Sequence, residues 1–176
     1  MRKSFFTVFV LFVCAVFSGC GYSVRSSSLG SIRTIHIEPF KNKINYGTET
    51  VRGLYVPLME VKLTNAVVDR YLFDGNLRVI DKEKADLILQ GELTNFQRDA
   101  LRYTDNNDVE EYRLTMTVSM TLWDNVQQKP RWSESGFSGD TTYFVTGPLA
   151  KSESLAIEDA LKDIARRIVE RTIEDW

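Results

Sequence analysis

Few side chains in this sequence are suited to chemistry. The chain has two cysteines, Cys14 and Cys20, and one histidine, His36. His36 alternates with Ile35 and Ile37 as in a β-strand, and no second ligand stands beside it at metal-binding spacing. No serine lies in the G-x-S-x-G context of a nucleophile elbow. We therefore predict a protein that is not an enzyme and has no metal or cofactor, with His36 as a solvent-facing structural residue.

Charged side chains form two further candidate groups. An acidic group could bind Ca²⁺ but lacks the spacing and glycine of an EF-hand, so a solvated turn is the favoured interpretation. A basic group falls at predicted strand ends and turns, where such side chains could bind phosphate, with dispersed surface charge as the alternative. The acidic residues are Asp105, Asp108, Glu110 and Glu111, and the basic residues are Arg98, Arg102, Lys129, Arg131 and Lys151.

The first nineteen residues have the pattern of an export signal. Arg2 and Lys3 supply a positive start, an apolar run over residues 5–17 follows, and the small pair Ser18 and Gly19 ends it. The run is shorter than the ~20 residues that a membrane-spanning helix needs. We predict that residues 1–19 are a cleaved signal peptide.

Cys20 directly follows this small pair, and the order resembles the bacterial lipobox. In that motif the cysteine sulfur receives a diacylglycerol and the cysteine becomes the mature N-terminus. Phe17 stands where the motif favours Leu. The alternative is ordinary cleavage that leaves a free thiol or an intermolecular disulfide. We predict that Cys20 is lipidated and anchors the protein to a membrane.

The remaining chain is long enough for one folded domain. Residues 20–31 are rich in Ser and Gly and predict a tether, and residues 32–176 predict the domain. Loss of two basic residues with the signal leaves 20 basic against 24 acidic side chains, a net charge of −4 with His36 neutral. Because nucleic-acid binding depends on a basic excess, we do not expect a nucleic acid as partner.

Alternation of apolar and polar residues predicts the strands of the domain. The clearest case is residues 112–123, where Leu114, Met116 and Val118 belong to an apolar face opposite a threonine-rich one. Gly136 and Gly139 in the last strand indicate a bulge or bend. Strands are predicted within residues 32–39, 77–81, 86–103, 112–123 and 131–145.

Steps of three and four residues predict two helices, one over residues 48–74 and one over residues 152–176. Pro57 could delay the regular part of the first helix, and Gly75 is a candidate C-terminal cap. The predicted fold is α+β, a two-layer sandwich of two helices on a mostly antiparallel, four-stranded or five-stranded sheet, in the order strand, helix, strands, helix. The apolar face predicted for the first helix includes Tyr55, Leu58, Val61, Val68 and Leu72.

Several stretches resemble the LptE family of lipopolysaccharide-assembly lipoproteins of Gram-negative bacteria. They are CGYSVRSSS, IRTIHIEPFKNK, LTNAVVDRYLFDGNLRVIDKEKADLILQGELTNF, YRLTMTVSMTLWD and LKDIARRIVERTIEDW, and together they cover nearly all of the mature chain. The resemblance implies a domain lipid-anchored in the outer membrane on its periplasmic side. It also implies that the domain plugs the β-barrel translocon LptD and binds lipopolysaccharide.

Only Cys20 is carried over from the family by its motif. The ligand-binding residues stay unassigned, with Arg98, Arg102, Lys129 and Arg131 as candidates. The alternative function is a lipid-anchored pilot or assembly module for another envelope secretion channel.

Overall fold

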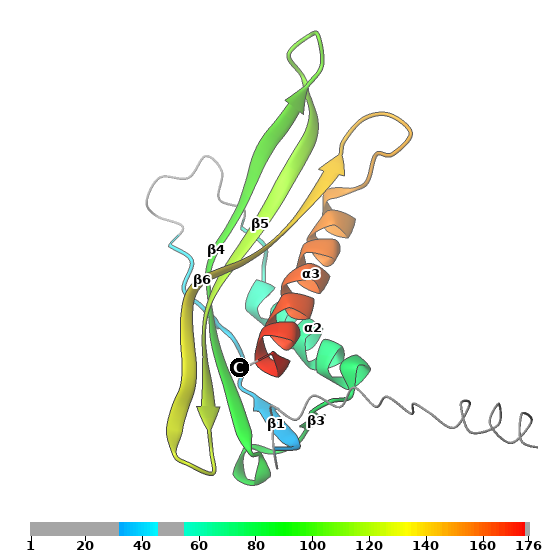
Figure 1. Ribbon diagram of the computed structural model, residues 1–176. Helices are drawn as coiled ribbons and strands as arrows, with labels where there is room; N and C mark the ends of the chain where they lie inside the picture. Colours follow the sequence, from blue (N-terminus) through cyan, green and yellow to red (C-terminus); the bar gives the residue numbers. More distant parts are fainter. Residues whose placement is uncertain (1–31, 46–54, 175–176) are drawn as a thin grey trace, which may run out of the picture.

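Two helices lie against one face of a single long sheet in the computed structural model, which describes residues 32–45 and 55–174 (Figure 1). The predicted signal peptide, Cys20 and the tether lie outside the described residues. The helices are α2 (Met59–Asp74) and α3 (Glu153–Ile173), and a short 3-10 helix is η2 (Lys82–Lys84). The strands are β1 (Thr34–Ile37), β2 (Lys41–Asn42), β3 (Arg78–Val79), β4 (Leu87–Tyr103), β5 (Val109–Asp124) and β6 (Lys129–Phe144).

The sheet has six strands in the order β3-β1-β4-β5-β6, with β2 also paired to β4. The predicted α+β class is confirmed, but the predicted count of four or five strands is wrong. The long pairs β4–β5 and β5–β6 are antiparallel, whereas β1 pairs in parallel with β3 and β4, and β2 pairs in parallel with β4. Since β2 and β3 have two residues each, they are too short to show a period in the sequence.

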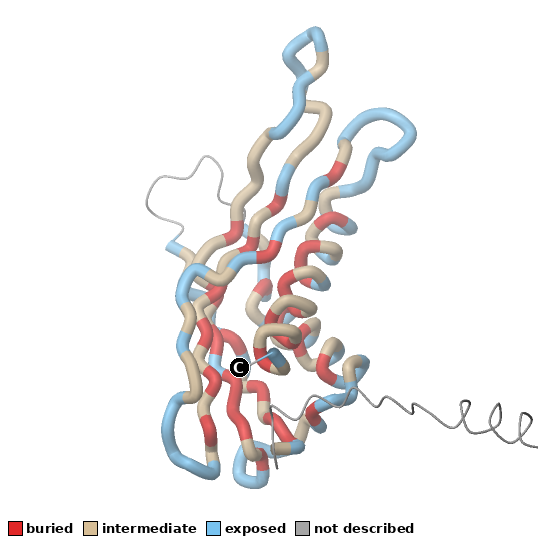
Figure 2. The backbone as a smooth tube through the Cα atoms, in the orientation of Figure 1, coloured by how far each residue is buried: buried red, intermediate tan, exposed pale blue. Residues whose placement is uncertain are grey.

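β5 confirms the predicted alternation along its length. Its buried side chains face the helices, and the intervening threonine and serine side chains are half-buried on the open face. Figure 2 shows that buried positions lie where the helices cover the sheet, whereas the β4–β5 hairpin beyond them is half-buried or exposed. The buried apolar residues of β5 are Leu114, Met116, Val118, Met120 and Leu122.

β4 departs from the predicted alternation in its second half. Leu93 is buried, but a shift of register between Leu93 and Asn95 makes Phe96, not Asn95, the next fully buried residue. This irregularity behaves as a β-bulge, which changes the face on which the following side chains lie. The bulge therefore places Arg98 on the helix-facing side of the sheet, where it meets α3.

α2 buries a different face from the one predicted. Its buried residues are Met59, Leu63, Val67 and Tyr71, whereas Leu58 and Leu72 are 65% and 63% exposed. The side of α2 facing the core is fixed partly by a buried hydrogen bond, in which the Tyr71 hydroxyl donates to Thr172 Oγ1 of α3 at 2.8 Å. Most of the apolar face predicted from the sequence is thus exposed at the surface, and of its named residues Val68 is half-buried against the core.

The ends of α2 follow local backbone signals. The helix begins at Met59, after Leu58 in the left-handed region with φ 55°, rather than at Thr48 or Pro57. Residues 46–54 of the predicted helix lie outside the described residues. At the other end Gly75 has φ 73° and donates its N–H to the Tyr71 carbonyl, which confirms the predicted cap.

α3 confirms the helix predicted within residues 152–176, and its buried residues follow the predicted steps of three and four. Ser152 caps the helix by accepting the N–H of Leu155, and the Asp163 carboxylate accepts a 2.7 Å hydrogen bond from Arg167 four residues later. In β6, Gly136 with φ 73° lies at a shift of register against β5, so the predicted bulge is also confirmed. The buried residues of α3 are Ala156, Ala160, Leu161, Ile164, Ala165, Ile168, Val169 and Thr172.

The start of β1 is joined to the start of β4 by Asp86. Asp86 Oδ2 accepts the Arg33 N–H, the Thr34 N–H and the Thr34 hydroxyl at 2.9, 3.0 and 2.7 Å. The Asp86 N–H in turn donates to Thr34 Oγ1. Burial acts to raise the pKa of Asp86, but these hydrogen bonds together outweigh it, and the pKa lies below its ordinary value of 3.8.

We expect Asp86→Asn to destabilise the domain by ~1–2 kcal/mol at pH 7, because the charge-assisted hydrogen bonds become weaker. The pKa of Asp86 is lower in the folded than in the unfolded protein. Ionised Asp86 therefore contributes to the free energy of unfolding above its unfolded-state pKa near 3.8, and this contribution is lost as the pH falls through its folded-state pKa. Urea unfolding at several pH values measures this. Asp81→Asn is the control, because the Asp81 side chain makes no capping hydrogen bond. An unchanged difference between wild type and Asp86→Asn down to pH 2 would contradict the assignment.

Candidate functional site

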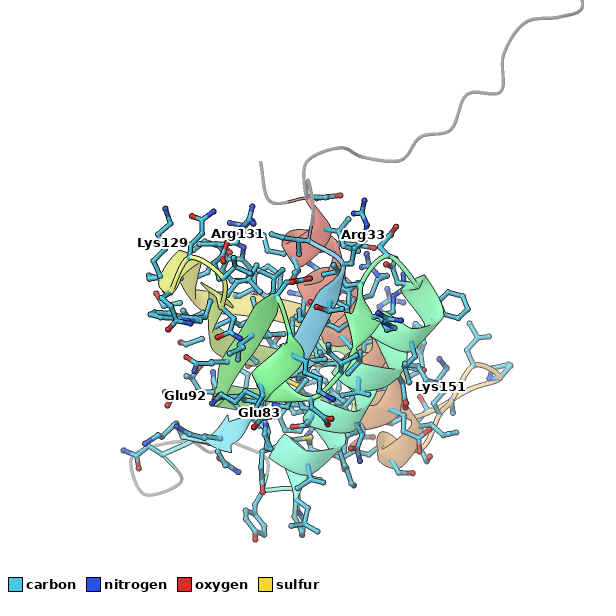
Figure 3. The ribbon with its side chains drawn as sticks, turned by 90° about the horizontal axis from the view of Figure 1, so that it is seen from below. Arg33, Glu83, Glu92, Lys129, Arg131 and Lys151 are labelled. Carbon is cyan, nitrogen blue, oxygen red and sulfur yellow. The ribbon has the colours of Figure 1, made fainter. Side chains whose placement is uncertain are left out.

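The basic residues singled out in the sequence divide between two ends of the sheet. Arg98 and Arg102 lie in the second half of β4, and Lys151 lies just before α3. Lys129 and Arg131 begin β6 at the other end, and Figure 3 shows them close together and far from Lys151. We call the end formed by the β4–β5 hairpin and the loop after β6 the distal end. The structure does not bring the five basic residues to one surface.

Arg98 is the centre of a cluster that joins three strands to α3. Its Nη1 donates to Glu153 Oε1 at 2.9 Å, and its guanidinium carbon lies 4.7 Å from the ring centroid of Tyr112. Tyr112 stacks on Tyr143 with 5.8 Å between ring centroids and 28° between planes. Such contacts stabilise a cation over an aromatic face. We call Arg98, Tyr112, Tyr143 and Glu153 the distal cluster.

The electrostatics of the distal cluster keep Arg98 charged. Burial acts to lower the pKa of Arg98, but its hydrogen bond with Tyr143 and the charge of Glu153 raise it above the ordinary value. Burial raises the pKa of Tyr143, so that this phenol stays neutral. The cluster therefore presents a permanent cation beside two aromatic rings and the Glu153 carboxylate, and its guanidinium is a group that can bind an anion.

The other basic residues of the distal end also have acidic partners. Arg102 Nη2 lies 3.6 Å from Glu111 Oε2 with its guanidinium over the Phe144 ring, and Lys151 Nζ lies 3.0 Å from Asp159 Oδ2. Exposed apolar side chains surround them, of which Leu149 is 72% exposed. This end thus combines paired cations with exposed apolar surface. The exposed apolar residues here are Leu101, Tyr103, Val145, Leu149 and Leu155.

At the opposite end, Arg131 supports a turn. Its Nη1 lies 3.8 Å from Asp124 Oδ2, and Asp124 is buried, with its Oδ1 accepting the N–H groups of Val126 and Gln127. Lys129 is exposed at the start of β6. The geometry of Arg131 is that of a residue that holds the β5–β6 turn.

His36 and Glu111, two of the remaining candidates from the sequence, each contact another residue of the domain. His36 is half-buried rather than fully solvent-facing as predicted, and its Nδ1 lies 3.0 Å from the Ile80 carbonyl oxygen. Glu111 of the acidic group pairs with Arg102. Across residues 32–45 and 55–174, no three His, Cys, Asp or Glu side chains are grouped as metal ligands. No helix in this part of the chain is both long and apolar enough to cross a membrane.

Sequence reasoning missed the partners of Arg98. Tyr112 and Tyr143 were noticed only as members of predicted strands, and Glu153 only as part of a helix. These side chains come together because of the antiparallel registers of the sheet. Tyr112 of β5 lies opposite Ala100 of β4 on one side and opposite Tyr143 of β6 on the other. An arginine two residues after a buried aromatic residue in a strand was the only local signal, and it is weak.

Comparison with protein families gives one match over most of the chain. The family model described as "LptE: Lipopolysaccharide-assembly" matches residues 32–172. The matched part includes α2, α3 as far as Thr172, the whole sheet and the distal cluster. A search of curated proteins found no match.

Several solved structures share the fold. A Xanthomonas campestris protein is 16% identical, with a TM-score of 0.57, over 81% of this chain and 84% of that one. The minor lipoprotein of Acinetobacter baumannii is 15% identical, with a TM-score of 0.51, over 80% and 92% of the two chains. A hypothetical protein of Chlamydia trachomatis is 10% identical, with a TM-score of 0.52, over 81% and 96%. At these identities the similarity supports the α+β fold alone.

Proposed function

Since the chain belongs to the LptE lipopolysaccharide-assembly family, we propose that it is a non-enzymatic outer-membrane lipoprotein that plugs and stabilises an LptD-type β-barrel and binds lipopolysaccharide. The observation that carries this proposal is the family match over the whole described domain. The distal cluster is consistent with it, because a guanidinium beside two aromatic rings is suited to binding an anionic group.

Cys20 is the proposed lipid anchor. Acyl chains on this residue would hold the protein at the periplasmic side of the outer membrane. The tether of residues 21–31 has a reach of at most ~40 Å when fully extended. The domain would therefore work close to the membrane in which its barrel partner resides.

The open face of the sheet is the proposed contact with the barrel. It carries hydroxyl side chains along β5, and Thr121 Oγ1 lies 2.9 Å from Ser133 Oγ of β6. The interior of a large transmembrane barrel is polar. Among residues 32–45 and 55–174 no layer covers this polar face, and a polar face suits such an interior better than it suits lipid. The half-buried hydroxyl residues of this face in β5 are Thr115, Thr117, Ser119 and Thr121.

The distal end is the proposed contact with lipopolysaccharide. Arg98 and Arg102 lie there beside exposed apolar side chains, and an acylated, phosphorylated glycolipid offers groups that match both. Lys129 and Arg131 lie at the other end of the sheet, and Arg131 already supports the Asp124 turn. We therefore assign the ligand to Arg98 and Arg102 in preference to Lys129 and Arg131.

Extraction of the full-length protein in mild detergent tests the barrel partner. We expect a large β-barrel protein to copurify with it in a stable complex. A monomer that never carries a barrel partner would contradict the plug, and it would favour a different envelope role.

Lipopolysaccharide titration of the purified full-length protein tests the distal end. We expect Arg98→Gln to weaken binding about tenfold, as for loss of one charge-assisted hydrogen bond. Glu153→Gln should preserve or strengthen binding, because it leaves Arg98 charged and removes its carboxylate partner. Lys129→Gln is the matched control at the opposite end. Equal losses in Arg98→Gln and Lys129→Gln would show that the distal end is not the site.

A further inference from the structure

The side of α2 that faces away from the core carries a row of apolar side chains. Val61 is 46% exposed and Leu72 is 63% exposed, and Val68 between them is half-buried. Leu58, directly before the helix, is 65% exposed and continues the row. Exposed apolar side chains that are contiguous mark a surface that binds a partner. We call Val61, Asn65, Val68 and Leu72 the outer seam of α2.

The outer seam has the spacing of a coiled-coil seam. Its residues follow steps of four, three and four, so Asn65 and Leu72 take a positions and Val61 and Val68 take d positions. The buried residues of α2 lie on the other side of the helix, which packs beside α3 on one face of the sheet (Figure 1). α2 therefore presents one side to its own domain and a second side that suits another helix.

Two opposite charges flank the outer seam. Lys62 and Asp69 are exposed, and each directly follows a d position, so both take e positions. Within residues 32–45 and 55–174, neither side chain has a hydrogen-bond or ion-pair partner. They are seven residues apart, which is ~10 Å along one helix, so they cannot pair with each other in the same copy. Charges at e positions form salt bridges between helices.

A second copy of α2 in the antiparallel orientation fits both the apolar row and these charges. When Leu72 packs on Val61 of the other copy, the same register sets Asn65 beside Val68 of that copy. It also brings Lys62 level with Asp69 of the other copy. Each of these contacts occurs twice, as in an isologous two-fold interface. A parallel pair would instead set Lys62 level with Lys62, so the charges favour the antiparallel arrangement.

We propose that two copies of this protein pair through the outer seams of their α2 helices in antiparallel orientation. A contact of about three helical turns is smaller than a standard protein interface, so the dimer is weak and reversible. The pairing uses α2 and leaves the open face of the sheet and the distal cluster uncovered. It goes beyond the proposed function and does not depend on it.

Sedimentation equilibrium of the purified full-length protein in mild detergent tests the pairing. We expect a reversible dimer, which Lys62→Asp or Asp69→Lys should each weaken about tenfold because both symmetric charge pairs become repulsive. The double variant Lys62→Asp/Asp69→Lys should recover the wild-type dissociation constant. Lys84→Asp, a change of an exposed lysine in η2, is the matched control and should have no effect. Thermal unfolding checks that each variant is folded.

Two further variants test the apolar contact. Leu72→Lys should leave the protein monomeric, since it places a charge in two of the layers. Val126→Lys is the matched control, because Val126 is 72% exposed in the turn between β5 and β6, away from α2.

Oxidative cross-linking in membrane vesicles tests the orientation. The double variant Val61→Cys/Leu72→Cys should form a covalent dimer. Val61→Cys alone should not, because the two copies of residue 61 would lie ~16 Å apart along the antiparallel helices.

A full-length protein that stays monomeric at every concentration would overturn the proposal. So would a charge-swapped double variant that dimerises no better than the single variants, or a covalent dimer of Val61→Cys alone. Lys62→Asp should still copurify with the barrel and bind lipopolysaccharide. Absence of both properties from wild type would contradict the plug function and leave the helix pairing standing.

Discussion

Gly91→Val is expected to destabilise the domain by ~3 kcal/mol, because a side chain at this position in β4 has no room. A Cβ at Gly91 would lie 2.1 Å from Phe40 Cε1 and 2.5 Å from two further ring carbons. Phe40 is itself buried, at 3% exposure, so its ring cannot move into solvent without loss of core packing. The missing side chain of Gly91 is therefore what allows the segment after β1 to lie flat on the sheet.

A double-mutant cycle separates the steric clash with Phe40 from any other destabilising effect of replacing Gly91. Phe40→Ala alone should cost ~3–5 kcal/mol through the cavity that it leaves. In the Phe40→Ala background, Gly91→Val should cost far less than in wild type, because the space of the ring is now free. Urea unfolding measures all four proteins. Gln90→Val is the control, since Gln90 is an exposed neighbour in the same strand. Strictly additive free energies would rule out the steric contact.

Cys20→Ser is expected to abolish acylation and membrane retention of the mature protein. Each buried methylene contributes ~0.8 kcal/mol to membrane affinity, and stable anchoring needs about two chains, so a mature chain with none should leave the membrane fraction. Mass spectrometry of the mature N-terminus and fractionation of the envelope measure the two effects. Because our proposal places the barrel partner in the same membrane, the yield of the barrel complex should fall together with acylation and membrane retention.

Cys14→Ser provides the matched control for Cys20→Ser. Cys14 lies within the predicted signal peptide, so its replacement should leave the acylated mature chain unchanged. A mature protein that begins at a residue other than Cys20, or that carries no acyl chain, would contradict the lipobox interpretation. It would support the alternative of ordinary cleavage.

Where only one face of a segment was apolar, the sequence predicted the element and its buried side together. β5 buries the apolar face that was predicted for residues 112–123, and α3 buries side chains at the predicted steps of three and four residues. Gly75 and Gly136 were also identified correctly, because a positive φ is a local requirement that favours glycine. These features depend on neighbours within a few residues of one another.

The distal cluster could be predicted only in part. Arg98 was a candidate because an arginine near a strand end could bind phosphate. Its three partners come from β5, β6 and α3, and the residues paired with Arg98 and Tyr112 depend on register shifts in β4. Register is a property of two strands together, so no single segment of sequence specifies it.

By itself, the sequence determined the α+β class, the alternation of β5, the position of α3 and the Gly75 cap, because each follows from a local period or a backbone requirement. Tertiary structure alone decided which side of α2 is buried. That helix has one apolar face at Met59, Leu63, Val67 and Tyr71 and a second at Leu58, Val61 and Leu72. Periodicity cannot choose between two apolar faces. The choice came from packing on the sheet and from the Tyr71 hydrogen bond to Thr172, a contact between residues 101 positions apart.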